Sequence, residues 1–230
     1  MMKMRSRKRG RKKRPLGRIA LGVIAAALVT AGAVWLITSP RGGLGPIVNL
    51  NFAARANKVQ GQVEELPWVT RALLPVNQYS RPGDKLTRVN AVVIHYVGNP
   101  GTTAEQNRSY FARLAESGET YASSNFVIGL QGEILECVPV NEVAYCSNWR
   151  NHDTLSIECC HPDDTGKFTD ATYDSLVKLT AWLCDAFGLQ SGDVIRHYDI
   201  TGKICPKYFV DHPDAWKRFL ADVMDAVKAR

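Results

Sequence analysis

The stretch VNAVVIHYVGNP, Val89–Pro100, decides the expected fold. Its first eight residues are rich in β-branched side chains, and Gly98, Asn99 and Pro100 close it. A short β-branched run that ends in such a cluster is typical of a buried strand followed by a turn. We therefore take this segment as a central strand and build the domain outward from it.

Helical and extended patterns alternate downstream of this strand. Helices are predicted at 103–117, 170–187 and 212–228. The second of them stops at Gly188, a residue type that favours helix C-termini. Strands are predicted at 125–130, 133–138, 142–146, 154–160 and 193–196, the first two as a hairpin around Gln131-Gly132. Intermixed strands and helices predict an α/β domain with a central mixed β-sheet and flanking helices.

The first forty residues have a different composition. Residues 1–18 hold ten of the 29 basic residues and no acidic one, and residues 19–38 carry no charge at all. Twenty apolar residues at about 1.5 Å each match a bilayer core of about 30 Å. We expect a basic cytoplasmic tail at 1–18 and one N-terminal transmembrane helix at 19–38.

Basic residues collect on the cytoplasmic side of a span, so the body is expected outside the cell, anchored in the membrane by a single pass. A cleaved signal peptide and secretion are the alternative, but the apolar run is longer than a typical signal core. A nucleic-acid partner is not expected, because the rest of the chain has 19 basic and 22 acidic residues. The basicity belongs to the tail.

Residues 39–67 are rich in Pro, Gly, Asn and Ala without a sustained apolar period, which predicts a linker, with a short helix near 51–65 as an option. The globular domain is then expected at 68–230. Six cysteines lie in this domain, where an extracellular location permits disulfides. Cys137 with Cys146 is the one pairing that the spacing suggests, and the other cysteines are expected to be buried apolar residues.

Three residues have the chemistry of metal ligands. His95 ends the central strand, while His197 and Cys205 bracket the turn-rich segment HYDITGKIC. A catalytic zinc site typically takes three protein ligands and leaves the fourth position to water. The alternative for each histidine is a purely structural role, and spacing alone does not decide between the two.

Two charged residues lie beside these candidates. Lys203 precedes Cys205 by two positions, so on an extended segment its ammonium would project to the same side and stabilise an oxyanion. Glu158 lies in the apolar run TLSIECC, where desolvation would raise its pKa into the range useful for proton transfer. A solvated surface lysine and a buried ion pair are the respective alternatives.

Four ordered motifs carry a resemblance to a known family: VIHYVGNPG, SNFVIGLQGEI, SNWRNHDTLSIE and IRHYDITGKICP. Together they resemble the zinc-dependent N-acetylmuramoyl-L-alanine amidase type 2 family, which includes peptidoglycan-recognition proteins and phage T7 lysozyme. The similarity runs from Val89 to Val223. It implies an α/β fold with a zinc ion (Zn2+) in a groove that holds a glycan strand and its stem peptide.

Carried over by position, the resemblance makes His95, His197 and Cys205 the zinc ligands. Glu158 matches a catalytic glutamate and Lys203 an oxyanion-stabilising lysine. The catalytic tyrosine of the phage enzyme would align with Ser124, so Glu158 is the better candidate for the base. His152, His161 and His212 are assigned to surface or loop positions.

The resemblance implies hydrolysis of the bond between N-acetylmuramic acid and L-alanine by a monomer whose partner is peptidoglycan. The first alternative is a peptidoglycan sensor that binds without cutting. The second is another zinc hydrolase that acts within the stem peptide. The polar and aromatic residues beside the motifs are candidates for the substrate groove: Asn107, Asn148, Trp149 and Arg150.

Overall fold

The computed structural model describes residues 46–230. The predicted tail (1–18) and membrane anchor (19–38) lie outside the described residues and stay predictions. Within the described part, none of the helices combines the length and apolar character that crossing a bilayer requires.

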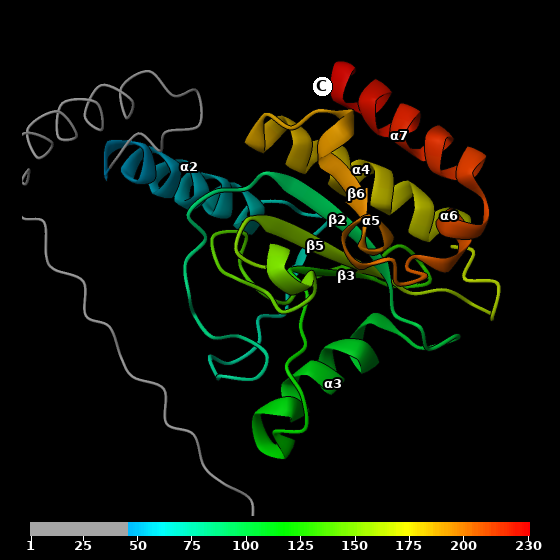
Figure 1. Cartoon of the computed structure of the whole chain (residues 1–230), viewed down its shortest axis with the longest axis horizontal. Coiled ribbons are helices and arrows are strands. Elements are labelled where there is room, and N and C mark those ends of the chain that lie inside the picture. Colours follow the sequence, from blue (N-terminus) through cyan, green and yellow to red (C-terminus); the bar gives the residue numbers. More distant parts are fainter. Residues whose placement is uncertain (1–45) are drawn as a thin grey trace, which may run out of the picture. The chain divides into compact units, whose positions relative to one another are not determined.

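A mixed sheet of six strands forms the centre of the domain, in the order β1-β4-β3-β5-β2-β6 (Figure 1). The strands are β1 (Thr70–Arg71), β2 (Ala91–Tyr96), β3 (Phe126–Ile128), β4 (Ile134–Glu136), β5 (Thr154–Cys159) and β6 (Val194–Arg196). Neighbours are parallel except β3 and β4, which form the predicted antiparallel hairpin. β2 lies inside the sheet, as its apolar run predicted.

Helices cover both faces of this sheet. They are α2 (Pro46–Glu64), α3 (Ala104–Ser117), α4 (Asp170–Phe187), α5 (His197–Thr201), α6 (Lys207–Asp211) and α7 (Pro213–Lys228), with 3-10 turns at Asn148–Arg150 and Ser191–Asp193. In Figure 1, α4 and α7 lie on one side of the sheet and α3 on the other. Thr103 and Gln106 form a capping box at the start of α3, and Gly188 ends α4 with φ 71°. The predicted α/β class is confirmed.

Alternation along the strands decides which face carries the candidate site. Ile94 and Ile157 pack into the core that also contains the buried side of α4. Successive side chains of a strand point to opposite faces, so His95 and Glu158 point away from that core, toward the α3 side. The two residues are register partners on β2 and β5. The sheet itself therefore sets them side by side.

Within the expected linker at 39–67, the short helix considered near 51–65 is present, and it is longer than expected and packs on the domain. Residues 46–64 form α2, whose Ala56, Val59 and Val63 are buried against the domain. Gln60 Oε1 accepts a hydrogen bond from the Val140 amide at 2.8 Å. Three apolar side chains spaced over two turns are enough to dock a helix without a sustained period, so the folded domain includes residues from Pro46 onward.

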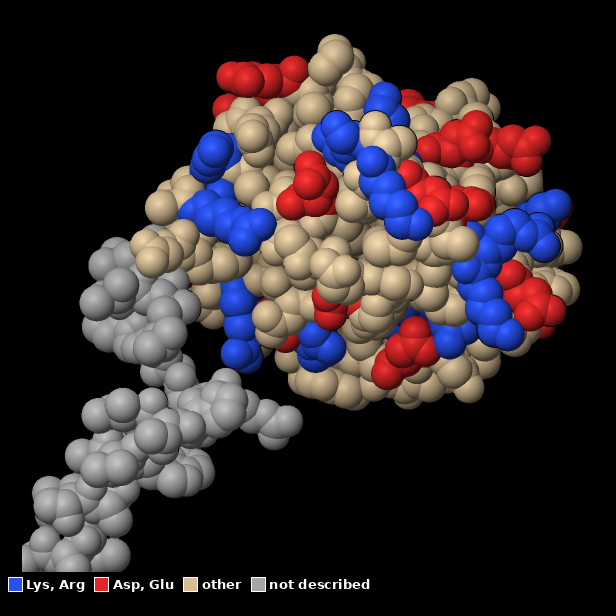
Figure 2. Space-filling model, turned by 90° about the horizontal axis from the view of Figure 1, so that it is seen from above, with Lys and Arg blue, Asp and Glu red and all other residues tan. Residues whose placement is uncertain are grey.

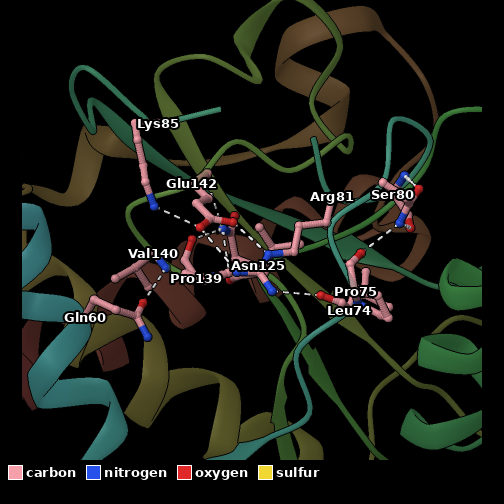
Figure 3. Close-up of polar contacts among 12 residues, drawn as sticks. Gln60, Leu74, Pro75, Ser80, Arg81, Lys85, Asn125, Pro139, Val140 and Glu142 are labelled. Atoms are coloured by element: carbon pink, nitrogen blue, oxygen red, sulfur yellow. Dashed lines mark hydrogen bonds and ion pairs between the residues drawn. The ribbon is translucent and has the colours of Figure 1, made fainter. Parts of the chain in front are cut away.

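The strand expected at Glu142–Cys146 is wrong, and side chains take up part of its backbone hydrogen bonding, since the Tyr145 amide donates to Ser123 Oγ and the Cys146 amide to Asn151 Oδ1. The segment makes an isolated bridge, Lys85 with Glu142. The Asn125 amide donates to three backbone carbonyls within 138–142, and Arg81 and Lys85 converge on the Glu142 carboxylate (Figure 3). The chain is held here as a loop.

The expected disulfide between Cys137 and Cys146 is not formed, since all six cysteines are free thiols. Cys137 packs in the apolar cluster on the α3 side of the sheet. Cys146 instead directs its thiol to Glu158 Oε1 at 3.5 Å. One thiol therefore belongs to the core and the other to the candidate site.

Candidate metal centre

The three candidate ligands converge although they are far apart in the sequence. The ligand atoms of His95, His197 and Cys205 all lie within 4.8 Å of one another, and all three residues are buried. Cys205 Sγ lies 3.8 Å from His95 Nδ1, and the two imidazole ring centroids are 4.8 Å apart. This is the cluster that the residue types and motifs predicted.

Strand register explains why the two histidines meet. β2 and β6 are parallel neighbours in which Ile94 pairs with Arg196. The next residues are His95, on β2, and His197, which follows the end of β6 and begins α5, so the two histidines lie at the same edge of the sheet. The chain then turns through α5 and returns, and the Tyr198 amide donates to the Cys205 carbonyl at 2.9 Å. That bond holds Cys205 beside the histidines.

The protonation states of these groups suit a metal. Burial, with the nearby His197 and Lys203, holds the pKa of His95 well below its usual value. Burial and Lys203 lower the pKa of His197 to about 4, so both rings are neutral at pH 7. Burial raises the pKa of the Cys205 thiol to about 12, and a coordinating metal reverses that effect by deprotonating the thiol.

The donor set and its geometry fit zinc. His197 Nδ1 is buried without a hydrogen-bond partner, which calls for an explanation in a folded protein. Two ligands of a tetrahedral zinc, at about 2.1 Å for nitrogen and 2.3 Å for sulfur, lie about 3.6 Å apart. The 3.8 Å between His95 Nδ1 and Cys205 Sγ is close to that separation. Three such ligands are the number that catalytic zinc sites use.

Glu158 lies next to this cluster with one carboxylate oxygen free. Its carboxylate comes within 4.8 Å of the His95 imidazole, and its Oε2 is buried without a hydrogen-bond partner. Burial raises the pKa of Glu158 to about 7, which the Cys146 thiol and Lys203 offset only in part. No cationic side chain of residues 46–230 lies within 4 Å of it, so the ion-pair alternative is not supported.

Lys203 is exposed at the rim of the cluster. Its charge acts on the pKa of His95, His197 and Glu158, which places it near all three. The segment is not extended as expected. The Cys205 amide donates back to the Lys203 carbonyl at 2.7 Å, and the Lys203 amide donates to Thr201 Oγ1. A tight turn therefore carries Lys203 to the site.

Two of the four predicted groove residues have protein partners instead. The Asn107 amide group is buried and donates to the Thr103 carbonyl at 2.8 Å, within the first turn of α3. Arg150 pairs with Asp153 at 2.7 Å. Both side chains hold local structure, and their polar character beside the motifs did not reveal that.

The other two groove residues lie in the 3-10 turn next to the cluster. Asn148 Oδ1 accepts a hydrogen bond from His197 Nε2 at 2.8 Å, so it contacts a ligand rather than open groove. Both residues are exposed, and Trp149, whose side chain makes no such contact with a ligand, is 66% exposed. The geometry keeps Trp149 as the groove candidate.

Sequence reasoning missed two residues of the site. Cys146 contacts Glu158, and Ser147 Oγ lies 3.5 Å from His95 Nε2. Ser147 opens the SNWRNHDTLSIE motif and Cys146 immediately precedes it, but neither residue type predicts a contact with a particular ligand.

The other three histidines and Ser124 were also assigned positions from the sequence. His152 and His212 are exposed, as expected. His161 lies in a loop, as expected, but it is buried there, with its ring centroid 5.0 Å from that of Tyr96 and Nδ1 2.7 Å from the Asp163 carbonyl. Ser124 is fully buried and bonded within the sheet, so it leaves the tyrosine role of the phage enzyme vacant.

The family model and the curated relatives that match this chain are all N-acetylmuramoyl-L-alanine amidases. A family model described as N-acetylmuramoyl-L-alanine amidase matches residues 85–208. N-acetylmuramoyl-L-alanine amidase CwlL of Bacillus licheniformis is 34% identical over 154 residues, which cover 62% of this chain and 42% of that protein. N-acetylmuramoyl-L-alanine amidase BlyA of Bacillus subtilis (strain 168) is 33% identical over 182 residues, which cover 70% and 47%. The chain thus spans less than half the length of these relatives.

Solved structures agree on the fold. The catalytic domain of XlyA superposes with a TM-score of 0.56 at 25% identity, covering 66% of this chain and 98% of that one. A mutant endolysin from Bacillus subtilis gives a TM-score of 0.57 at 24% identity, covering 66% and 97%. Nearly all of each of these structures has its counterpart in the present domain.

Proposed function

The chain belongs to the N-acetylmuramoyl-L-alanine amidase family, and from this premise we propose that it hydrolyses the amide bond between N-acetylmuramic acid and L-alanine in peptidoglycan. One observation carries the proposal: a zinc-type ligand set, His95, His197 and Cys205, lies beside the half-buried Glu158, whose Oε2 is buried and has no hydrogen-bond partner. A metal site and a proton carrier are the two parts that amide hydrolysis by an activated water needs.

The residues divide the chemistry between them. When bound, zinc supplies Lewis-acid polarisation of the amide carbonyl and lowers the pKa of a bound water. Glu158 takes the proton of the attacking water and returns it to the L-alanine nitrogen as the amide bond breaks. Lys203 places an ammonium where it stabilises the oxyanion. Cys205 acts as a ligand and not as a nucleophile, so no covalent enzyme intermediate forms.

The substrate is held outside the metal cluster. Trp149 offers an exposed aromatic surface one residue from Asn148, which contacts the ligand His197. Such a ring can pack against a sugar or a peptide side chain. Figure 2 shows Lys and Arg interspersed with Asp and Glu on the face it displays, without a continuous patch of one sign. A neutral glycan strand with its stem peptide is the proposed partner, bound by a monomer.

A sensor that binds peptidoglycan without cutting is the rival. Such a protein needs neither a proton carrier nor an oxyanion stabiliser. Glu158 with its raised pKa and Lys203 at the rim favour the enzyme over this sensor.

We also propose that the chain is a single-pass membrane protein with a cytoplasmic N-terminus and an external catalytic domain. The support is the basic tail at 1–18 followed by the uncharged segment 19–38. Protease added to intact spheroplasts should degrade residues 46–230 while the chain fractionates with membranes. Recovery of a shortened chain in the medium would favour the cleaved, secreted form.

The reaction is tested by digesting purified peptidoglycan with the full chain. We expect about one zinc per chain and the release of new L-alanine amino groups, lost on chelation and restored by zinc. Release of amino groups at another position of the stem peptide would favour the other zinc hydrolase. Binding of muropeptides without new amino groups would favour the sensor.

A further inference from the structure

Two consecutive residues of one loop contact the far side of both histidine ligands. Asn148 Oδ1 lies 2.8 Å from His197 Nε2, and Ser147 Oγ lies 3.5 Å from His95 Nε2. Neither contact involves Cys205. The loop therefore contacts Nε2 of both rings and leaves Nδ1 of both free of it.

The chemistry of the Asn148 contact fixes one tautomer. A neutral imidazole carries its hydrogen on one nitrogen only, and an amide oxygen can only accept. His197 Nε2 must therefore be the protonated nitrogen, which leaves the lone pair on Nδ1. That atom is the buried nitrogen without a hydrogen-bond partner. On His95, Nδ1 lies 3.8 Å from Cys205 Sγ and Nε2 lies 3.5 Å from Ser147 Oγ, which as a hydroxyl can accept a hydrogen from Nε2 as well as donate.

The backbone of the loop is shaped for this contact. Asn148 has φ 53°, and within residues 46–230 it is the one non-glycine residue with a positive φ. Asparagine enters this left-handed region more readily than most residues, yet such a conformation persists only where its surroundings enforce it. Asn151 Oδ1 supplies that restraint by accepting from the amides of Cys146 at 3.1 Å and Ser147 at 2.6 Å.

We propose that Asn148 is a positioning residue that holds His197 in the Nε2–H tautomer and so keeps Nδ1 available to the metal, with Ser147 assisting at His95. The inference rests on the proposed zinc site and assigns Asn148 a role other than substrate binding. Contacts of this kind orient ligand rings and strengthen metal binding in other zinc proteins.

The first test needs no variant. Long-range proton–nitrogen NMR spectra of the metal-free full chain, labelled with 15N-histidine, report which ring nitrogen of His197 carries the hydrogen. We expect Nε2–H. A dominant Nδ1–H form would overturn the inference, whatever the protein's activity.

The second test compares variants that separate the side chain from the backbone. Asn148→Gly keeps the left-handed backbone and removes the acceptor, whereas Asn148→Asp keeps an acceptor at the same place. We expect Asn148→Gly to weaken zinc binding about 10–100-fold in competition with a chelator, and Asn148→Asp to bind within a few fold of wild type. His152→Ala, an exposed change in the same loop, should leave zinc affinity unchanged.

The outcomes separate this inference from the proposed function. If wild type binds zinc and releases L-alanine amino groups while Asn148→Gly binds zinc equally well, the inference fails and the function stands. If wild type takes up no zinc at pH 7, both fail. A weakened Asn148→Gly beside an intact Asn148→Asp supports the inference.

Discussion

Glu142, which is buried, and Glu158, which is half-buried, are two carboxylates of the same domain with opposite surroundings. Glu142 receives hydrogen bonds from Arg81 at 2.7 and 3.2 Å and from Lys85 at 2.8 Å (Figure 3). Burial alone would raise the pKa of Glu142, but these two cations outweigh it and lower the pKa. Glu158 has one contact with a thiol, and burial raises its pKa to about 7.

This difference indicates a structural role for Glu142 and a role in proton transfer for Glu158. Glu142 is charged, fully engaged and able to hold a loop in place. Glu158 keeps an oxygen free beside the ligand set and lies near the midpoint of its titration at pH 7, which suits a group that takes up and releases a proton. The predictions below test this contrast, from the largest expected effect to the smallest.

Removing a ligand should disable the site and spare the Glu142 region. We expect Cys205→Ala to lose zinc and to cut amidase activity by more than about 10³-fold, because the metal supplies several kcal/mol of transition-state stabilisation. Metal analysis and the release of L-alanine amino groups measure this. If Cys205→Ala still held about one zinc per chain, Cys205 would not be a zinc ligand.

Removing the Glu142 carboxylate should lower the free energy of unfolding and leave the catalysed reaction unchanged. Glu142→Ala leaves the Arg81 guanidinium, whose side chain is 14% exposed, without its partner. We expect a loss of about 3–5 kcal/mol in the free energy of unfolding. Activity per folded molecule should persist. Lys85→Ala is the control in urea titrations, since its exposed ammonium contributes about 1 kcal/mol or less; an equal loss in both variants would contradict this account.

A third carboxylate sharpens the comparison. Glu136 is fully buried, and burial raises its pKa to about 7, which Gln60 and Arg71, at 3.7 Å, offset only in part. Between the ordinary pKa of 4.5 and this raised pKa the folded state holds a proton that the unfolded state has released, so stability falls as pH rises through that range and levels off above it. We expect this group to remove about 2–3 kcal/mol over that range.

Urea unfolding of wild type and Glu136→Gln at pH 5 and pH 8 isolates the contribution of Glu136. The stability difference between the two proteins should grow from pH 5 to pH 8, in favour of the variant. A difference that does not change with pH would show that Glu136 is ionised in the folded protein.

The smallest effect is expected at Cys146. A thiol is a weak donor, so Cys146→Ala should change activity less than about tenfold and stability by about 1 kcal/mol. The same peptidoglycan assay and urea titration apply. Loss of zinc as complete as in Cys205→Ala would instead make Cys146 a ligand, since it also lies within 4.8 Å of His95 and Glu158.

The sequence predicted those parts that depend on local pattern or residue type. The apolar run before His95 identified β2, and the motifs identified His197 and Cys205. It gave α2 only as an optional short helix near 51–65, because Ala56, Val59 and Val63 dock a helix without an extended apolar period.

The wider environment of the ligands could not be read from the sequence either. Whether Asn148 meets His197 depends on a left-handed backbone at one loop residue, and pattern carries no information about that. The contact of Cys146 with Glu158 likewise depends on how a loop folds over β5. Such contacts follow from tertiary structure and not from spacing.

The most direct test of the contrast between the two carboxylates is Glu158→Gln in the full chain, with zinc content, unfolding free energy and release of L-alanine amino groups measured on one preparation. We predict that zinc stays at about one per chain, that stability is retained, and that activity falls about 10²–10⁴-fold because the proton carrier is gone. Wild-type activity in this variant would contradict the account.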